Sequence, residues 1–303
     1  MRHQWADLPA EVRDLIGGRC GTVTRVTVPD AGEVAEFAAA LEADTGRLFV
    51  KAARLDSPNL WMARKEAQAA PAVKGIGAAL LWQEEADGWL VTAFEYVPGR
   101  HADLSPGSSD LPMIAGTLTG LADRLTPAPA LKTFSLARRW AGSALWSEIA
   151  ATGGLTPWQA EHLERLRELE SRVSDAVAGE TLAHTDMTGP NILVDGARVR
   201  VIDWSWPAPA APWVDTASLV PRLIAAGHSA AGAHRWATTV PHYAAADPVD
   251  LAALAAVIAA RWRLRALRDG GVWDALSAAA EAWVADLLGV SAPGGGLPRE
   301  RRR

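Results

Sequence analysis

The amino-acid sequence predicts an α+β protein with a small, strand-rich N-terminal lobe and a larger, mainly helical C-terminal lobe. Before residue 96, short apolar or alternating stretches such as 22–28 and 48–52 are bounded by turn signals, which favours antiparallel strands. After Pro98-Gly99, apolar residues recur mostly at helical spacing. We therefore expect an N-terminal lobe over residues 1–96, a C-terminal lobe over 97–290 and a disordered tail over 291–303.

Composition narrows the class of protein. The 303 residues are 49% hydrophobic and 21% charged, so a sizeable core can form. The net charge of −5 provides no broad attraction to nucleic acid or anionic lipid, so neither is an expected partner. A single cysteine, Cys20, excludes an internal disulfide and fits a reducing cytoplasm. Since we find neither a signal peptide nor a membrane-spanning apolar run, we expect a cytoplasmic protein.

The N-terminal elements follow from periodicity and turn residues. Residues 33–43 are Ala-rich and acidic, and they fit a strand or a helix equally well. Asp87-Gly88 is a typical hairpin turn. The expected strands are 22–28, 48–52, 80–84 and 89–96, and the expected helices are 5–16 and 58–70.

Helical spacing dominates the rest of the chain. The clearest helix is 155–177, which opens with a capping box, Thr156-Pro157-Trp158-Gln159. The other expected helices are 111–125, 135–150, 213–226, 229–238, 248–268 and 272–288.

The most specific pattern is a short hairpin with polar residues at its ends. Two apolar strands, 192–194 and 199–202, are joined by a tight turn at Asp195-Gly196. Asp186 and Asn191 precede the first strand, and Asp203 follows the second. An aspartate can orient the proton of an attacking hydroxyl, and Asn and Asp oxygens suit Mg²⁺. This order is what magnesium-dependent phosphoryl transfer needs, so the pattern predicts a phosphotransferase.

Lys51 is one of four lysines and lies in an apolar strand, where an ammonium is costly unless it is paired. Glu66 follows fifteen residues later in an expected helix and is a plausible partner. In phosphoryl transfer such a lysine holds the nucleotide phosphates. A lysine at a strand end that reaches solvent is the structural alternative.

Three further positions join this pattern. The segment Glu95, Tyr96 and Val97 could offer backbone groups to an adenine edge, although an ordinary linker is the alternative. His184 is expected to pack beneath the loop rather than act as a base. Asp215 could brace the loop or simply cap the helix that follows it.

Together, Lys51, Glu66, His184-x-Asp186-x4-Asn191 and Ile202-Asp203 resemble the aminoglycoside phosphotransferase family, a small-molecule branch of the protein-kinase-like fold. The resemblance covers about residues 20–220. It implies a bilobal kinase-like fold, with Lys51 and its partner Glu66 on the ATP phosphates. It also implies Asp186 as catalytic base, Asn191 and Asp203 as Mg²⁺ ligands, and backbone atoms of Glu95, Tyr96 and Val97 on adenine.

Three features of the chain bear on this resemblance. Thr185 and Met187-Thr188 replace the Gly and the Leu-His common in the family's loop, although Gly189 and Asn191 keep their places. Trp204-Ser205 follows Asp203 where protein kinases have Phe-Gly, which is the habit of the family and argues against a protein kinase. The expected phosphate loop holds only Gly32, with Glu33 and Glu36 nearby, and acidic groups repel a triphosphate.

The acceptor is harder to read from the sequence. A polycationic aminoglycoside needs an acidic pocket, but Arg261, Arg263, Arg265 and Arg268 offset the acids of the last helices, so no acidic face emerges. Tryptophans are plentiful in this lobe, and most are expected in the core. Trp206 and Trp213, which flank a Pro-rich loop, are the preferred substrate-wall candidates.

We therefore expect an ATP- and Mg²⁺-dependent kinase that acts on a hydroxyl of a small molecule, with an antibiotic such as an aminoglycoside as one candidate. Two alternatives stay open. The chain could be a nucleotide-binding regulatory protein without transfer activity, an alternative that the acidic, Gly-poor loop favours. It could also be a metal-dependent phosphoesterase, although no second His/Asp cluster supports that chemistry.

Overall fold

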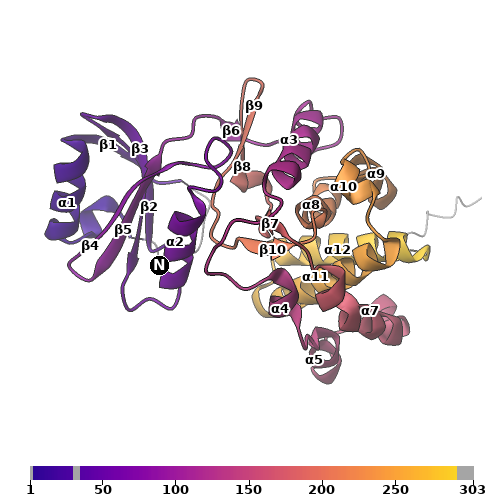
Figure 1. Cartoon of the computed structure of the whole chain (residues 1–303). Coiled ribbons are helices and arrows are strands. Elements are labelled where there is room, and N and C mark those ends of the chain that lie inside the picture. The colour runs from indigo at the N-terminus through magenta and orange to yellow at the C-terminus, as the bar shows by residue number, and fades with distance from the viewer. Residues whose placement is uncertain (1–2, 30–34, 292–303) are drawn as a thin grey trace, which may run out of the picture. The chain divides into compact units, whose positions relative to one another are not determined.

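The computed structural model describes residues 3–29 and 35–291 (Figure 1). The predicted tail, apart from Ser291, and the predicted phosphate-loop residues Gly32 and Glu33 lie outside these ranges. Packing divides the chain into two units. A strand-rich unit comprises Met1–Ala102, Pro129–Thr133 and Thr188–Pro207, and a helical unit comprises Asp103–Ala128, Phe134–Met187 and Ala208–Arg303. The predicted α+β class is confirmed.

These units do not coincide with the predicted lobes of 1–96 and 97–290. The hairpin that carries Asn191 and Asp203 packs within the strand-rich unit, although it follows the first helices of the helical unit in sequence. Asp186 lies two residues before the change of unit and belongs to the helical unit.

The strand-rich unit is built on a five-stranded antiparallel sheet in the order β1-β2-β3-β5-β4. Within the ambiguous segment 33–43, Phe37–Ala43 form strand β2, which pairs with β3 along its whole length. The β4–β5 turn has positive φ at Asp87 and Gly88, +44° and +76°, as a two-residue hairpin requires. The strands are β1 (Val23–Thr27), β2 (Phe37–Ala43), β3 (Gly46–Arg54), β4 (Leu80–Ala86) and β5 (Trp89–Glu95).

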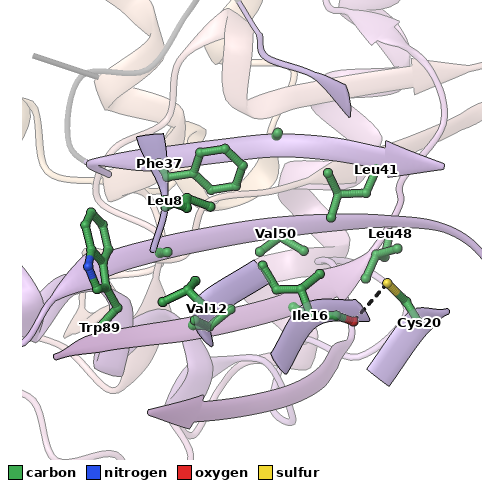
Figure 2. Packing of buried hydrophobic residues seen from close by; sticks show 13 residues of the cluster. Leu8, Val12, Ile16, Cys20, Phe37, Leu41, Leu48, Val50 and Trp89 are labelled. Carbon is green, nitrogen blue, oxygen red and sulfur yellow. Dashed lines mark hydrogen bonds between the residues drawn. The ribbon is translucent and has the colours of Figure 1, made fainter. Parts of the chain in front are cut away.

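Helix α1 (Ala10–Cys20) covers one face of this sheet. Its Val12, Ile16 and Cys20 recur every fourth residue and are buried, so they form one stripe. Figure 2 shows this stripe against Phe37, Leu41 and Val50 of the sheet, together with the Cys20 thiol that donates to the Ile16 carbonyl at 3.1 Å. Alternation along β3 sends Leu48 and Val50 toward α1, so Lys51 faces the other way.

Helix α2 (Leu60–Ala69) contacts β3 and β5. Glu66 lies on its buried side and is 6% exposed. The period of the strand and the period of the helix therefore bring a lysine and a glutamate to the same buried place.

A second, three-stranded sheet completes the strand-rich unit in the order β6-β8-β9. Its strands are β6 (Arg100–His101), β8 (Ile192–Asp195) and β9 (Arg198–Val201). In the β8–β9 hairpin Ile192 pairs with Val201, and the Ile202 N–H donates to the Asn191 carbonyl at 2.9 Å. This register sets Asn191 beside the residue that precedes Asp203.

The helical unit is organised around α11 (Pro248–Asp269), which packs against α5, α7, α8 and α12. Residues 251–257 of α11 are buried without exception, and alanine predominates among them, which allows neighbouring helices to approach closely. The other helices are α3 (Asp110–Arg124), α4 (Leu136–Trp140), α5 (Leu145–Ala151), α6 (Pro157–Glu161), α7 (Leu163–Ala176), α8 (Val214–Ala225), α9 (Ala230–Ala237), α10 (Pro241–Ala244) and α12 (Val272–Leu288).

Three predicted helices have different limits in the structure. The helix expected over 135–150 is divided into α4 and α5, with Gly142 at φ +74° between them. The helix expected over 155–177 breaks at His162 into α6 and α7, although the capping box at its start is present. The helix expected over 5–16 starts only after Pro9 and runs to Cys20.

The Pro-rich segment after Trp206 was expected as a loop, but part of it is a strand. β10 (Ala208–Ala210) pairs with β7 (Thr181–Ala183), the strand that leads into the His184 loop. Within the residues described, no helix is long and apolar enough to cross a membrane.

Candidate active site

The strand-rich unit brings two other predicted site residues, Glu66 and Asp203, to Lys51. The Lys51 ammonium lies 2.9 Å from both carboxylate oxygens of Glu66 and 3.1 Å from Asp203 Oδ1. The Lys51 and Glu66 side chains are only 16% and 8% exposed, whereas that of Asp203 is 40% exposed. The lysine is therefore anchored on its buried side by Glu66, and Asp203 faces solvent.

The charges of this cluster act on one another. Burial alone would lower the pKa of Lys51, but the negative charges of Asp203 and Glu66 raise it above its usual value. Burial raises the pKa of Glu66 to about 7, the positive charge of Lys51 opposes that shift, and Asp203 adds to it. Two carboxylates and one ammonium leave an excess of negative charge that a cation would relieve.

Asp203 has a constrained backbone. Its φ is +62°, in the left-handed region that side chains other than glycine rarely adopt. The Ser205 hydroxyl donates to Asp203 Oδ1. A strained residue held in place by its neighbours is typical of a functional site.

The donor set at the hairpin fits Mg²⁺ only in part. Asn191 and Asp203, next to the ends of β8 and β9, carry side-chain oxygens of the hard kind that Mg²⁺ prefers. No group of three or more His, Cys, Asp and Glu residues that could hold a metal is found in the described part of the chain. A magnesium ion here would depend on oxygens from a ligand, which is how Mg²⁺ is usually held beside nucleotide phosphates.

The expected adenine segment starts at the end of β5. The Glu95 N–H donates to the Ala79 carbonyl at 2.9 Å, and its carboxylate pairs with Arg200 of β9. The Arg47 guanidinium lies 3.6 Å from the centre of the Tyr96 ring, and Val97 is 8% exposed. Since the Glu95 N–H is already engaged, any backbone donor offered to a ligand must come from Tyr96 or Val97.

In the helical unit the loop after β7 carries Asp186. The carboxylate of Asp215 accepts the N–H groups of His184 at 2.8 Å and Thr185 at 2.9 Å. His184 is fully buried, and its Nδ1 accepts the Asp186 N–H at 3.2 Å. Asp215 lies in the first turn of α8 and not at its N-cap, which is Trp213. Its side chain therefore braces the loop, and burial raises its pKa.

Thr185, the residue that replaces a common glycine, has φ +61°. This conformation is costly for a β-branched side chain. The Thr185 hydroxyl accepts a hydrogen bond from Arg139 Nη1 at 3.1 Å. The side chain that makes the backbone strained is also the one that binds an arginine.

Asp186 has a cation as neighbour. Arg222 Nη2 lies 3.7 Å from Asp186 Oδ1, and the two side chains are 19% and 44% exposed. Arg222 is seven residues beyond Asp215 on α8, so two helical turns place both on one side of the helix. Neither Arg222 nor Arg139 was predicted as a site residue, although this spacing from Asp215 could have indicated Arg222.

The two predicted substrate-wall tryptophans differ in exposure. Trp213 is 6% exposed, which leaves little surface for a ligand and disfavours that role. Trp206 is half-buried and meets Trp61 edge to face, with ring centres 4.7 Å apart. In the strand-rich unit Glu36, one of the acids near the expected phosphate loop, accepts the Arg54 N–H at 2.7 Å.

Comparison with known proteins relates this arrangement to a family. Residues 30–249 match the model of the phosphotransferase enzyme family, APH. Comparison with curated proteins gives no match.

Solved structures share the fold at low sequence identity. A thermostable mutant of aminoglycoside phosphotransferase APH(4)-Ia, in ternary complex with AMP-PNP and hygromycin B, is 12% identical with a TM-score of 0.58, and covers 89% of this chain and 98% of its own. A GDP complex of a mutant aminoglycoside 2'-phosphotransferase-IIIa is 14% identical with a TM-score of 0.63, covering 92% and 94%. Choline kinase LicA from Streptococcus pneumoniae is 15% identical with a TM-score of 0.56, covering 90% and 99%.

The predicted kinase-like fold is thus confirmed by structures that each cover most of the chain. Because the family model spans well over half of the residues, the chain belongs to the phosphotransferase enzyme family, as its motifs predicted.

Proposed function

We propose that the protein transfers the γ-phosphate of ATP to a hydroxyl group of a small molecule, with Mg²⁺ as cofactor. One observation carries the proposal. The Lys51 ammonium is bound by Glu66 and Asp203 inside the strand-rich unit, and Asp203 ends the hairpin that Asn191 begins. An anchored ammonium beside two potential metal ligands suits a polyphosphate.

Each residue then has a defined task. Lys51, held by Glu66, binds the nucleotide phosphates, and backbone groups of the segment 95–97 bind adenine. Asn191 and Asp203 hold Mg²⁺, which offsets charge on the phosphates when it is bound. Asp186 orients the acceptor hydroxyl and accepts its proton. His184 and Asp215 fix the loop that carries Asp186.

The proposed transfer forms one bond to phosphorus, breaks another and moves one proton. The acceptor oxygen forms a bond to the γ-phosphorus while the bond from that phosphorus to the β–γ bridging oxygen breaks. The hydroxyl proton passes to Asp186, and ADP and a phosphate monoester leave. Supporting this reading, complexes with AMP-PNP, ADP and GDP are known for structures of the same fold.

Mg·ATP binding and ADP production test the proposal. The thermal midpoint of the wild-type chain is measured with and without Mg·ATP, and ADP release is then followed with a panel of hydroxyl compounds. We expect Asp186→Ala to lower turnover by about 10²- to 10⁴-fold, the range for a lost general base, with ATP affinity nearly intact. Wild-type turnover in this variant would remove the mechanism, and tight nucleotide binding without turnover on any acceptor would favour a regulatory protein.

The variant Asp203→Ala tests the proposed binding of Mg²⁺ by Asp203. We expect it to weaken binding of Mg·ATP, because one of two protein ligands is lost, whereas binding of ATP in EDTA should change little. Asp195→Ala, at the exposed turn of the same hairpin, is the matched control. Unchanged Mg·ATP titration in Asp203→Ala would contradict its assigned role.

A further inference from the structure

Three arginines from three helices lie near the loop that carries Asp186 in the helical unit. Arg222 of α8 lies 3.7 Å from its carboxylate, and Arg139 of α4 binds the neighbouring Thr185. Arg261 of α11 is close enough for its charge to act on both Asp186 and Arg139. These residues are remote in sequence, and only the tertiary fold gathers them.

Tryptophans hold two of the three guanidinium groups. Arg222 lies over Trp262 at 5.0 Å and Arg261 over Trp140 at 5.5 Å from the ring centre. A cation over an aromatic face is positioned without consuming its N–H donors on a carboxylate. This contact gives two tryptophans of this unit, Trp140 and Trp262, a role beside the arginines.

The cluster carries more positive than negative charge. Two acids lie near the arginines. Asp186 is 44% exposed, whereas Asp215 is 9% exposed and already accepts two backbone N–H groups. Partial burial and then repulsion from Arg261 lower the pKa of Arg139 to about 10. The buried Nε of Arg222 has no hydrogen-bond partner among the described residues. Like charges gathered at partly buried positions are unfavourable unless an anion joins them.

Solvent nevertheless reaches the cluster. Arg139 and Arg222 are half-buried and Arg261 is exposed, so a ligand can approach all three. The strained φ of Thr185 adds a second sign of function, because its hydroxyl binds Arg139 at a position where glycine would avoid the strain.

We propose that the acceptor is a hydroxyl compound bearing an oxyanion group, a carboxylate or a phosphate, which Arg139, Arg222 and Arg261 bind while its hydroxyl meets Asp186. This inference rests on the proposed function. Guanidinium groups match both oxyanions through paired N–H donors. The same three charges repel a polycation, so hygromycin B and gentamicin, which are named with structures of the same fold, are disfavoured acceptors here.

A purely positioning role for Arg222 gives a different outcome. If Arg222 only oriented Asp186, its loss would lower kcat for every acceptor alike and would leave anion binding unchanged. The proposed role instead raises KM for anionic acceptors selectively.

Binding of inorganic phosphate tests the cluster without any turnover. The measurement is made by calorimetry on the full chain with saturating Mg·AMP-PNP, so that the nucleotide site is occupied. We expect Arg222→Gln and Arg261→Gln to weaken phosphate binding about tenfold or more, since each removes a charge-assisted contact. Arg268→Gln, an exposed arginine of the same helix α11, should bind as the wild type does. Equal phosphate affinity in Arg222→Gln and the wild type would overturn the proposal.

The proposal of an anionic acceptor is also tested in catalysis, with pairs of acceptors that differ in an anionic group. Glycerate is compared with glycerol, glucose 6-phosphate with glucose, and both pairs with hygromycin B and gentamicin, with ADP release as the readout. We expect the anionic member of at least one pair to have the higher kcat/KM; a preference for glycerate indicates a carboxylate and for glucose 6-phosphate a phosphate. A preference for the neutral members or the polycations would overturn the proposal.

Two controls keep this test separate from the proposed function. Arg222→Lys retains the charge but loses the planar donors, and circular dichroism shows whether each variant folds. Affinity for Mg·ATP should change less than twofold in the arginine variants. If their Mg·ATP affinity falls as far as their phosphate affinity, the arginines serve the nucleotide and the acceptor proposal fails, whereas a wild type that does not bind Mg·ATP at all contradicts the proposed function instead.

Discussion

The two units hold charged sites of opposite design. In the strand-rich unit one ammonium, Lys51, lies between the carboxylates of Glu66 and Asp203. In the helical unit one carboxylate, Asp186, has the guanidinium group of Arg222 3.7 Å away and two further arginines close to its loop. The lysine has its partners within the protein and is fixed in place. Arg222 and Arg261 are held by aromatic rings, whose contact leaves their N–H groups able to meet a ligand. The first site is preorganised by charge pairing, and the second is left with charge that a ligand can neutralise.

The substitution with the largest expected effect on stability is the one that removes the lysine of the first site. Lys51→Met leaves two neighbouring carboxylates without their cation in a site where Glu66 is 6% exposed. Breaking a buried pair from one side costs about 3 kcal/mol or more, so the free energy of unfolding in urea should fall by that amount. Mg·ATP binding should weaken as well.

The matching controls are a double variant and an exposed pair. Lys51→Met with Glu66→Gln should recover much of the lost stability, because the remaining charge is no longer opposed by a second carboxylate. Arg54→Met, at the end of the same strand, breaks an exposed pair with Asp56 and should lower the free energy of unfolding far less than Lys51→Met does. Similar losses in Lys51→Met and Arg54→Met would mean that the Lys51 cluster is not a buried pair in energetic terms.

The two designs also differ in how far the sequence predicts them. An apolar strand, one following helix and a separation of fifteen residues made Glu66 a plausible partner of Lys51, and the hairpin residues Asn191 and Asp203 were recognisable from local pattern. The arginine cluster depends on α4, α8 and α11 meeting in space, which no local pattern encodes. The same limit explains the helix breaks near Gly142 and at His162, where apolar spacing continues while the backbone turns.

A smaller expected effect is a dependence of the free energy of unfolding on pH, which comes from Glu66 in the first site and not from the arginines of the second. Burial raises the pKa of Glu66 from 4.5 to about 7. Between these values the folded chain binds more protons than the unfolded chain, so the free energy of unfolding falls as pH rises through that window and levels off above it. Since the pKa of about 7 already includes the pairing with Lys51, linkage gives this change a size on the order of 3 kcal/mol. The arginines stay charged throughout this range.

Urea unfolding from pH 4.5 to 8 measures this slope. Glu66→Gln should remove the Glu66 part of it, so the wild-type curve should fall relative to the variant as pH rises. Glu42→Gln, an exposed glutamate on β2, should keep the wild-type slope. If Glu66→Gln and the wild type change in parallel with pH, Glu66 does not titrate in this window.

Substitution of Thr185 should have the smallest effect on the free energy of unfolding. It should nevertheless weaken anion binding by the arginine cluster. Thr185→Gly relieves about 1 kcal/mol of strain at φ +61° but gives up the hydrogen bond to Arg139, worth about as much, so the free energy of unfolding should change by less than about 1 kcal/mol. Phosphate affinity with Mg·AMP-PNP bound should nevertheless fall about threefold to tenfold, because Arg139 is no longer oriented. Thr185→Ser keeps the hydroxyl and should bind phosphate as the wild type does. A Thr185→Gly chain that is more stable and retains full phosphate affinity would mean that the threonine has no part in positioning Arg139.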